Sequence, residues 1–192
     1  MVPFIKKLLP WNTGIALNTV GIVIHETASN GDSCDAEYGY IRDCLAGKYP
    51  DDNGHCFAHM YCDDTKIMQF APLNKECYHA CSPANEMFVG IECCHVRDGS
   101  PGAADRFNVI YESVAEWAAY YLRVICGVTV VTNENCMSHH EVTLKWKNSD
   151  HVDPTDYFAM YGKNMDMFRE RVRYYISIEL AWNKRMDTVN FW

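Results

Sequence analysis

Residues 20–33, VGIVIHETASNGDS, decide the fold class of this chain. The first five residues, Val20–Ile24, are continuously apolar and mostly β-branched, which predicts a strand buried on both faces. The strand ends at His25 and is followed by the turn-prone sequence SNGDS. Because open α/β sheets bind ligands beyond the carboxyl ends of their strands, His25 is the first candidate site residue.

Three further elements are predicted after this stretch. A helix is expected over residues 34–45, with Asp32 or Ser33 as its N-cap. The segments HCFAHMYC (55–62) and KIMQFA (66–71), which are separated by two aspartates, predict a hairpin. MFVGIECC (87–94) is another mostly apolar strand, and Glu92 is the single acid within it.

The second half of the chain is dominated by helical patterns. Apolar residues recur at helical spacing over 106–126, with Gly127 at the expected C-terminal cap. VTVVT (128–132) predicts a further strand, and residues 165–182 predict an amphipathic helix that ends near Trp182. The order of elements predicts an α/β fold, a single domain with a mixed central sheet flanked by helices.

Composition limits the classes of protein that the chain can belong to. It has 192 residues, of which 48% are hydrophobic and 22% are charged, which excludes a largely disordered or fibrous chain. A formal net charge of −8 argues against a nucleic-acid binder. No apolar run is long enough to insert across a membrane, and the first residues, MVPFIKKLLPWN, do not resemble a signal peptide.

Ten cysteines raise the question of disulfides or a structural metal. Their spacing contains no C-x-x-C pair, which argues against a cysteine-rich metal protein. We expect reduced thiols that are mostly buried and behave as small apolar residues, with disulfide formation as the open alternative.

The chemistry depends on a combination of residues rather than on any single one. His25 ends one strand, Glu92 lies within another, and the block SHHEVTLKWKNSDHVDP (138–154) adds histidines and an aspartate. A buried acid such as Glu92 must be paired, metal-associated or functional, although on strand alternation alone it could face solvent. Three nitrogen and oxygen ligands with an open fourth position are typical of a catalytic zinc site.

These segments, in this order, resemble the type 2 N-acetylmuramoyl-L-alanine amidases, a family that includes phage lysins, bacterial autolysins and peptidoglycan recognition proteins. The resemblance covers about residues 21–158. GIVIHETAS is similar to the family's first-strand motif, and FAHMYCDDTKIMQFAPLNKECYHA to its hairpin and following W-H-A segment. NEMFVGIECC resembles the N-x-x-S-I-G-I-E strand, SHHEV the G-H-x-D/E-V motif, and HVDP the closing K-x-D-P motif.

The resemblance implies one Zn²⁺ per chain, held by His25, His139 and Asp153. The rival second ligand is His140, because a slip of one residue in an extended segment reverses the direction of its side chain. Glu92 matches the family's general base. Members without this acid use a tyrosine of the hairpin, and that position is Ala58 here.

The chain departs from the family pattern at His151, where most members have a lysine that stabilises the oxyanion. A neutral histidine can also donate a hydrogen bond to an oxyanion, so the role can be preserved. The alternative is that His151 is a solvated loop residue and that Lys145 or Lys147 reaches the site instead.

Three more residues are candidates for binding the substrate. His79 in YHAC matches the histidine of W-H-A, which lines the family's substrate cleft, and Tyr78 replaces the tryptophan. Asn85 is expected to order the loop before the Glu92 strand. The implied substrate is bacterial peptidoglycan, a muropeptide, cleaved between N-acetylmuramic acid and L-alanine by zinc-activated water with Glu92 as the base.

Two questions of organisation follow from the resemblance. We expect a zinc amidase catalytic domain over residues 1–162, and over 163–192 an amphipathic helix and tail that either pack on the domain or begin a connection to another. A phage or prophage endolysin, held in the host cytoplasm until lysis, is the expected setting. The rival function is a recognition module that binds peptidoglycan without cleaving it, and the oligomeric state stays open.

Overall fold

The computed structural model describes residues 2–10, 13–49 and 56–178. Six strands form one sheet in the order β1-β4-β3-β5-β2-β6. The strands are β1 (Phe4–Lys6), β2 (Gly21–Glu26), β3 (Met60–Cys62), β4 (Ile67–Gln69), β5 (Phe88–Cys93) and β6 (Cys136–Ser138). The β3–β4 pair is antiparallel and the other pairs are parallel, so the predicted mixed sheet is confirmed.

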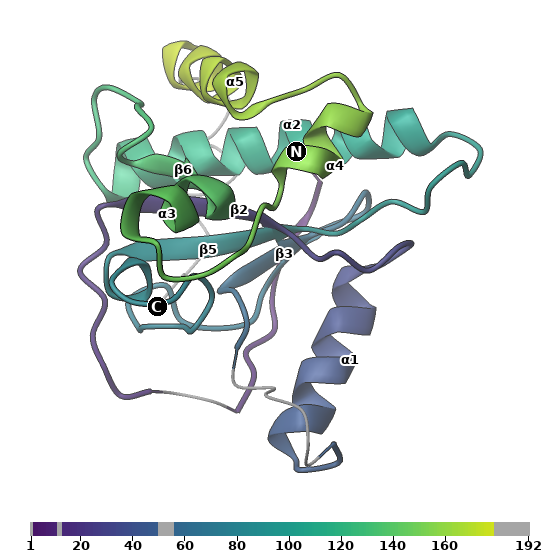
Figure 1. Ribbon diagram of the computed structural model, residues 1–192, viewed down its shortest axis with the longest axis vertical. Helices are drawn as coiled ribbons and strands as arrows, with labels where there is room; N and C mark the ends of the chain where they lie inside the picture. Colours follow the sequence, from purple (N-terminus) through teal and green to yellow (C-terminus); the bar gives the residue numbers. More distant parts are fainter. Residues whose placement is uncertain (1, 11–12, 50–55, 179–192) are drawn as a thin grey trace.

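Helices cover both faces of this sheet. They are α1 (Cys34–Leu45), the short 3₁₀ turn η1 (Ala84–Glu86), α2 (Ala103–Tyr120) with its π-helical continuation η2 (Tyr121–Ile125), α3 (His139–Trp146), α4 (Thr155–Met160) and α5 (Met165–Ser177). Figure 1 shows α2 along one face with α5 outside it, while α1 projects from the opposite face. The predicted α/β class and single-domain architecture are therefore confirmed.

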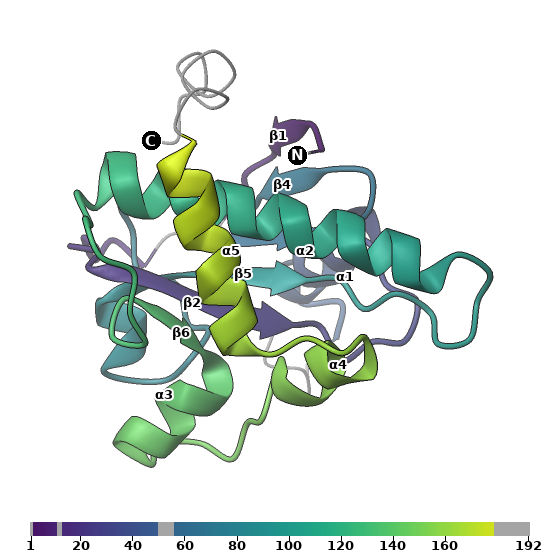
Figure 2. The ribbon, with the colours of Figure 1, turned by 90° about the horizontal axis from the view of Figure 1, so that it is seen from above.

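The main core lies between the sheet and α2. Phe107 and Trp117 of α2 are fully buried in it, together with Ile22 and Ile24 of β2. Burial on this scale is the dominant favourable contribution to folding, about 25 cal/mol per Å² of apolar surface. Figure 2 shows α5 crossing over α2, and the buried Phe168 of α5 joins the same core. The predicted amphipathic helix thus packs on the domain, and its expected end near Trp182 lies outside the described residues.

Strand β2 is buried along almost its whole length, as its continuous apolar sequence predicted. A Cβ at Gly21 would overlap the backbone of Asn135, so the glycine permits the close approach of the chain that leads into β6. Ser33 caps α1 by accepting a hydrogen bond from the Ala36 amide at 3.3 Å, which selects it over Asp32. The hairpin and the strand around Glu92 also form where expected, with shorter strands in the hairpin.

The strand predicted over residues 128–132 is wrong. This segment is irregular, and the strand that forms in this part of the chain is Cys136–Ser138, which pairs with β2 on the side away from β5. Val130 is 67% exposed, whereas the Val131 carbonyl accepts hydrogen bonds from Arg173 of α5. Arg173 of α5 thus binds a carbonyl group that would pair with a neighbouring strand if this segment were itself a strand. Tertiary contacts therefore outweigh the strand preference of the β-branched residues.

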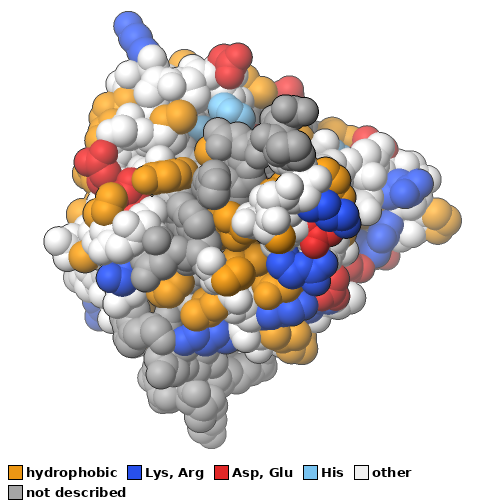
Figure 3. All heavy atoms as spheres, turned by 90° about the horizontal axis from the view of Figure 1, so that it is seen from below, with side chains coloured by type: hydrophobic (Ala, Val, Ile, Leu, Met, Phe, Trp, Pro, Cys, Tyr) orange, Lys and Arg blue, Asp and Glu red, His pale blue; other side chains and the backbone are white. Residues whose placement is uncertain are grey.

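Basic and apolar side chains lie together on one face of the molecule. Figure 3 shows Lys and Arg side chains gathered beside hydrophobic ones on the side opposite α2, although the formal net charge is −8. None of the helices in the described part of the chain is both long and apolar enough to cross a membrane.

Candidate active site

A cleft of about 480 Å³ opens at the carboxyl ends of β2 and β5. All eight residues that the sequence singled out line it, although they come from six separate segments of the chain. They are His25, Tyr78, His79, Asn85, Glu92, His139, His151 and Asp153. Their convergence follows from the topology, because parallel strands place their carboxyl ends at one edge of the sheet.

Three of these residues form a group that could hold a metal ion. One side-chain atom each of His25, His139 and Asp153 lies within 4.8 Å of the other two. The Asp153 carboxylate is 3.2 Å from Nδ1 of His25 through one oxygen and 3.2 Å from Nδ1 of His139 through the other. Both histidines are buried, at 2% and 4% exposure, so the group is shielded from bulk water.

A chain of hydrogen bonds fixes the proton on His25. Nε2 of His79 lies 3.0 Å from the Phe88 carbonyl oxygen, which can only accept, so this nitrogen donates. Nδ1 of neutral His79 is therefore an acceptor, and Nε2 of His25, 2.9 Å away, donates to it. Nδ1 of neutral His25 is left with a lone pair directed at Asp153. This tautomer suits a metal ligand, and the partner of the second ring nitrogen is what fixes it.

The charge states make this donor set suitable for a cation. Burial lowers the pKa of His25 to about 4, in spite of the opposing contact with Asp153. Burial raises the pKa of the Asp153 carboxyl, but the contacts with His139 and His25 together lower it by more than burial raises it. The net pKa is therefore well below its usual range. At neutral pH a carboxylate and an imidazole lone pair therefore face each other, and a cation between them would relieve the repulsion.

Glu92 faces the same cleft from β5. Its side chain is half-buried, and among the described residues Oε2 is buried without a hydrogen-bond partner. Burial, followed by the charge of Asp153, raises the pKa of the Glu92 carboxyl well above its usual value. A carboxyl with a raised pKa is a stronger base than an ordinary glutamate, which is the property required for proton transfer near neutral pH.

His151 lies at the edge of the cleft. Its ring stacks on His139 with centroids 4.2 Å apart, and its Nδ1 is 3.5 Å from Asp153. Its side chain is 58% exposed. Neither alternative lysine is among the described residues that line the cleft: Lys145 pairs with Glu134, and Lys147 ends α3 in a left-handed conformation.

Among the described residues, the metal group contains His139 and not His140. Nδ1 of His140 contacts the Thr155 hydroxyl at 3.1 Å. The segment is not extended at this point, because Ser138 is the N-cap of α3 and His139 is its first residue. The capping sequence S-H-H-E is a signal in the sequence that would have predicted this helix.

The remaining candidates form the wall of the cleft. The Asn85 side-chain oxygen accepts from the amides of His79 at 2.9 Å and Ala80 at 2.8 Å, so it holds the loop that carries His79. Tyr78 is 39% exposed. Tyr61, which no motif singled out, also lines the cleft and pairs in register with Glu92. Its position in the predicted hairpin was the available signal.

The cysteines do not contribute to the metal group. All ten are free thiols, and most are buried, as expected of small apolar residues. Among the described residues, no cysteine belongs to a cluster that could hold a metal ion.

Comparison with known proteins places this chain in one class. Residues 17–156 match the profile of the N-acetylmuramoyl-L-alanine amidases. Protein Ami of Listeria monocytogenes is 28% identical over 152 residues, which cover 77% of this chain and 15% of that protein. The bifunctional autolysin of Staphylococcus aureus is 22% identical over 152 residues, covering 79% and 12%. The chain thus spans less than a sixth of the length of these relatives.

Solved structures show the same fold. The S. aureus hydrolase AmiA, determined with its ligand, superposes with a TM-score of 0.78 at 20% identity, covering 100% of this chain and 89% of that one. A mutant endolysin from Bacillus subtilis superposes with a TM-score of 0.65 at 23% identity, covering 90% and 99%. The chain belongs to the N-acetylmuramoyl-L-alanine amidase family.

Proposed function

We propose that this chain is a zinc-dependent amidase that hydrolyses the bond between N-acetylmuramic acid and L-alanine of peptidoglycan. The observation that carries the proposal is the His25–His139–Asp153 group with Glu92 in the same cleft. Family membership supports the amide substrate, and the neutral His25 facing the ionised Asp153 supports the divalent ion.

His25, His139 and Asp153 would hold the metal ion. A closed tetrahedral site has four protein ligands, so three ligands leave one coordination position open for water or substrate. When bound there, zinc supplies a Lewis acid that polarises the scissile carbonyl and lowers the pKa of a water molecule to about 7.

The side chains of the cleft supply the proton transfers. Glu92 accepts a proton from the attacking water and returns it to the departing alanine nitrogen, for which its raised pKa is suited. His151 presents a ring N–H to the carbonyl oxygen as negative charge develops on it. His79 keeps the proton of His25 on Nε2, away from Asp153.

The test is an assay for new N-terminal alanine on purified peptidoglycan. We expect release by the zinc-loaded protein, loss after removal of the metal by a chelator, and recovery when zinc is restored. Asp153→Asn, which keeps the shape of the side chain, should release none at the same zinc concentration. Binding to the wall without any release would instead assign the chain to the recognition class.

We further propose that the chain acts as a phage or prophage endolysin. The fold that it shares with an endolysin from B. subtilis is compatible with this setting. Expression in the bacterial cytoplasm should leave cells intact until a pore-forming agent permeabilises the membrane, after which they should lyse. Lysis without permeabilisation would contradict the endolysin setting while leaving the proposed activity untouched.

A further inference from the structure

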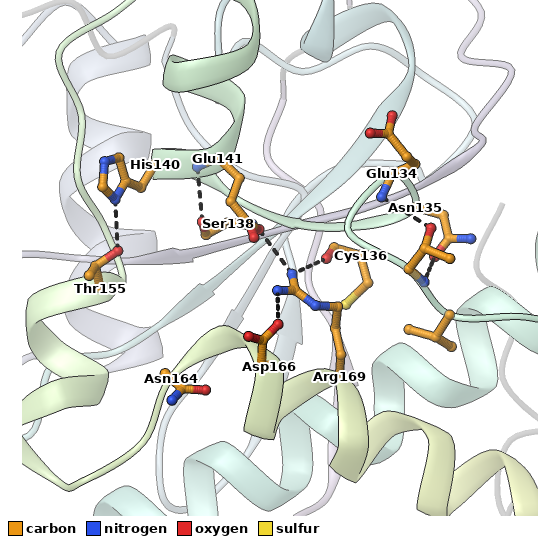
Figure 4. A network of polar contacts seen from close by, with 12 residues as sticks. Glu134, Asn135, Cys136, Ser138, His140, Glu141, Thr155, Asn164, Asp166 and Arg169 are labelled. Carbon is orange, nitrogen blue, oxygen red and sulfur yellow. Dashed lines mark hydrogen bonds and ion pairs between the residues drawn. The ribbon is translucent and has the colours of Figure 1, made fainter.

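The buried Arg169 of α5 is bonded to the segment that leads into His139 of the candidate active site. It is 6% exposed, and its guanidinium donates from Nη1 to the Cys136 carbonyl at 3.1 Å and to Glu141 at 3.0 Å. Nη2 donates to Asp166 at 2.7 Å. One side chain of the last described helix is therefore bonded to both β6 and α3, as Figure 4 shows.

Glu141 connects Arg169 to Ser138, the residue directly before His139. Its Oε2, the oxygen bound by Arg169, also accepts from the Ser138 amide at 2.8 Å. The Ser138 hydroxyl in turn accepts from the Glu141 amide at 3.0 Å, which completes a reciprocal capping box. Because His139 follows Ser138 directly, these bonds fix the backbone from which the candidate ligand projects.

The same segment is tied to the third candidate ligand. The His140 amide donates to the Asp153 carbonyl at 3.0 Å, and the His140 ring contacts Thr155, at the start of α4. Figure 4 places the His140–Thr155 and Arg169–Glu141 contacts on either side of the α3 N-terminus. The orientation of the backbone at residues 138–141 therefore affects both His139 and Asp153.

We propose that Arg169 is a positioning residue that holds His139 and Asp153 in the geometry required for metal binding. Arg169 lies beyond residues 17–156, the part of the chain that matches the family, so the proposal extends the functional unit into α5. It rests on the proposed function, because that function assigns His139 and Asp153 as ligands. Arg169 acts through Glu141 and Ser138 and contacts neither ligand side chain.

Asp166 provides a matched control. It also binds the guanidinium of Arg169, but its side chain is 87% exposed and lies on α5, the same helix as Arg169. If Arg169 only anchors α5, substitutions of Arg169 and of Asp166 should have similar effects on zinc affinity. If Arg169 positions the ligands, only substitutions that break the ion pair between Arg169 and Glu141 should weaken zinc binding.

The experiment compares Arg169→Met, Arg169→Lys, Glu141→Ala and Asp166→Asn in the full chain, at a temperature where each is folded. The first readout is the Kd for Zn²⁺, measured by competition with a chelating dye. Partners that orient metal ligands typically change metal affinity by about 10–100-fold. We expect Arg169→Met and Glu141→Ala to weaken zinc binding about tenfold, Arg169→Lys to recover most of the loss, and Asp166→Asn to stay within about twofold of wild type.

The second readout requires no metal. Amide hydrogen exchange at residues 138–141 should accelerate in metal-free Arg169→Met and Glu141→Ala, and should not in Asp166→Asn. The double variant Arg169→Met/Glu141→Ala should lose no more zinc affinity than the weaker-binding single variant, because both substitutions interrupt the same series of contacts from Arg169 through Glu141 to Ser138.

Wild-type zinc affinity and wild-type exchange at residues 138–141 in Arg169→Met would overturn the proposal, and so would additive losses in the double variant. If Arg169→Met does not fold, Glu141→Ala compared with Asp166→Asn tests the same series of contacts, because Glu141 joins Arg169 to Ser138, and wild-type zinc affinity and exchange in Glu141→Ala would overturn the proposal. If wild type itself binds no zinc, the proposed zinc site fails, whereas the exchange data still decide whether Arg169 orders this segment.

Discussion

His25 and Glu92 lie directly opposite each other on adjacent parallel strands, His25 on β2 and Glu92 on β5. The pairing of the two strands runs in register from Gly21 with Phe88 to Glu26 with Cys93. A metal ligand and a proton acceptor proposed for one reaction are thus held side by side by backbone hydrogen bonds rather than by a loop. A slip of one residue would direct one of the two side chains to the other face of the sheet.

The first prediction separates these two roles. Glu92→Gln removes the base and keeps nearly the same side-chain volume, so we expect kcat to fall by about 10²–10⁴-fold. The zinc Kd should change little, because Glu92 is not part of the metal group. Kinetics on a soluble muropeptide and dye competition for zinc measure the two quantities on one preparation. Equal loss of activity and zinc affinity would show that Glu92 supports the metal instead.

The second prediction concerns Gly90, which lies next to His79. A Cβ at Gly90 would lie 2.6 Å from Nδ1 of His79, the atom that accepts from His25. Gly90→Ala should push the buried ring away from His25 and destabilise the fold by about 1–3 kcal/mol. The loss of this partner should weaken zinc binding about tenfold. Dye competition checks the affinity, and an unchanged zinc Kd would show that His79 is not needed to orient His25.

Gly39 gives the contrasting third prediction. It lies within α1, and a Cβ there would meet no heavy atom within 4 Å. Gly39→Ala should therefore stabilise the protein by about 0.5–1 kcal/mol, since alanine loses less backbone entropy than glycine in a helix. Urea denaturation measures the change, and zinc affinity should stay at the wild-type value. Destabilisation would mean that α1 does not tolerate a methyl group at this position.

Local patterns predicted the elements that local forces dominate. The β-branched run of β2, the Ser33 cap of α1 and the single acid in β5 all form as expected. The eight candidate residues line one cleft, at the edge of the sheet where the parallel strands have their carboxyl ends. Their geometry supports the proposed ligand set, and their catalytic roles stay predictions.

The elements that were missed depend on contacts distant in sequence. Strand β1 is three residues long and exists through its pairing with β4, more than sixty positions away. The run over residues 128–132 is rich in β-branched residues, yet its carbonyl at Val131 is taken by Arg173. Arg169 carried no local signal, because an arginine on an amphipathic helix is normally solvent-exposed and its burial depends on β6 and α3.

The fourth prediction tests metal binding through stability. A ligand that binds only the folded state stabilises it, by about 2.7 kcal/mol when present at 100 times its Kd. Adding zinc to metal-free protein should therefore raise Tm by several degrees, since about 2–4 °C per kcal/mol is usual at this size. The shift should saturate, and it should vanish in Asp153→Asn. An equal shift in that variant would place the ion elsewhere.

The last prediction uses His95, whose two ring nitrogens both face carboxylates. Nδ1 lies 2.6 Å from Glu26 and Nε2 lies 3.0 Å from Asp98. Burial lowers the pKa of His95, but the hydrogen bonds to Asp98 and Glu26 raise it by more, so the net shift is upward. Only the imidazolium can donate from both nitrogens, and the neutral ring turns a lone pair towards one of the carboxylates.

A histidine whose pKa is raised on folding contributes stability that is fully present below its unfolded pKa of about 6.5 and is lost as pH rises through the folded pKa. The difference in free energy of unfolding between wild type and His95→Gln should thus be larger at pH 5.5 than at pH 8.5. Urea denaturation of metal-free protein at the two pH values measures it, and Asp98→Asn should reduce the difference because it removes one of the two acceptors. A difference that is equal at both pH values would show that folding does not shift the pKa of His95.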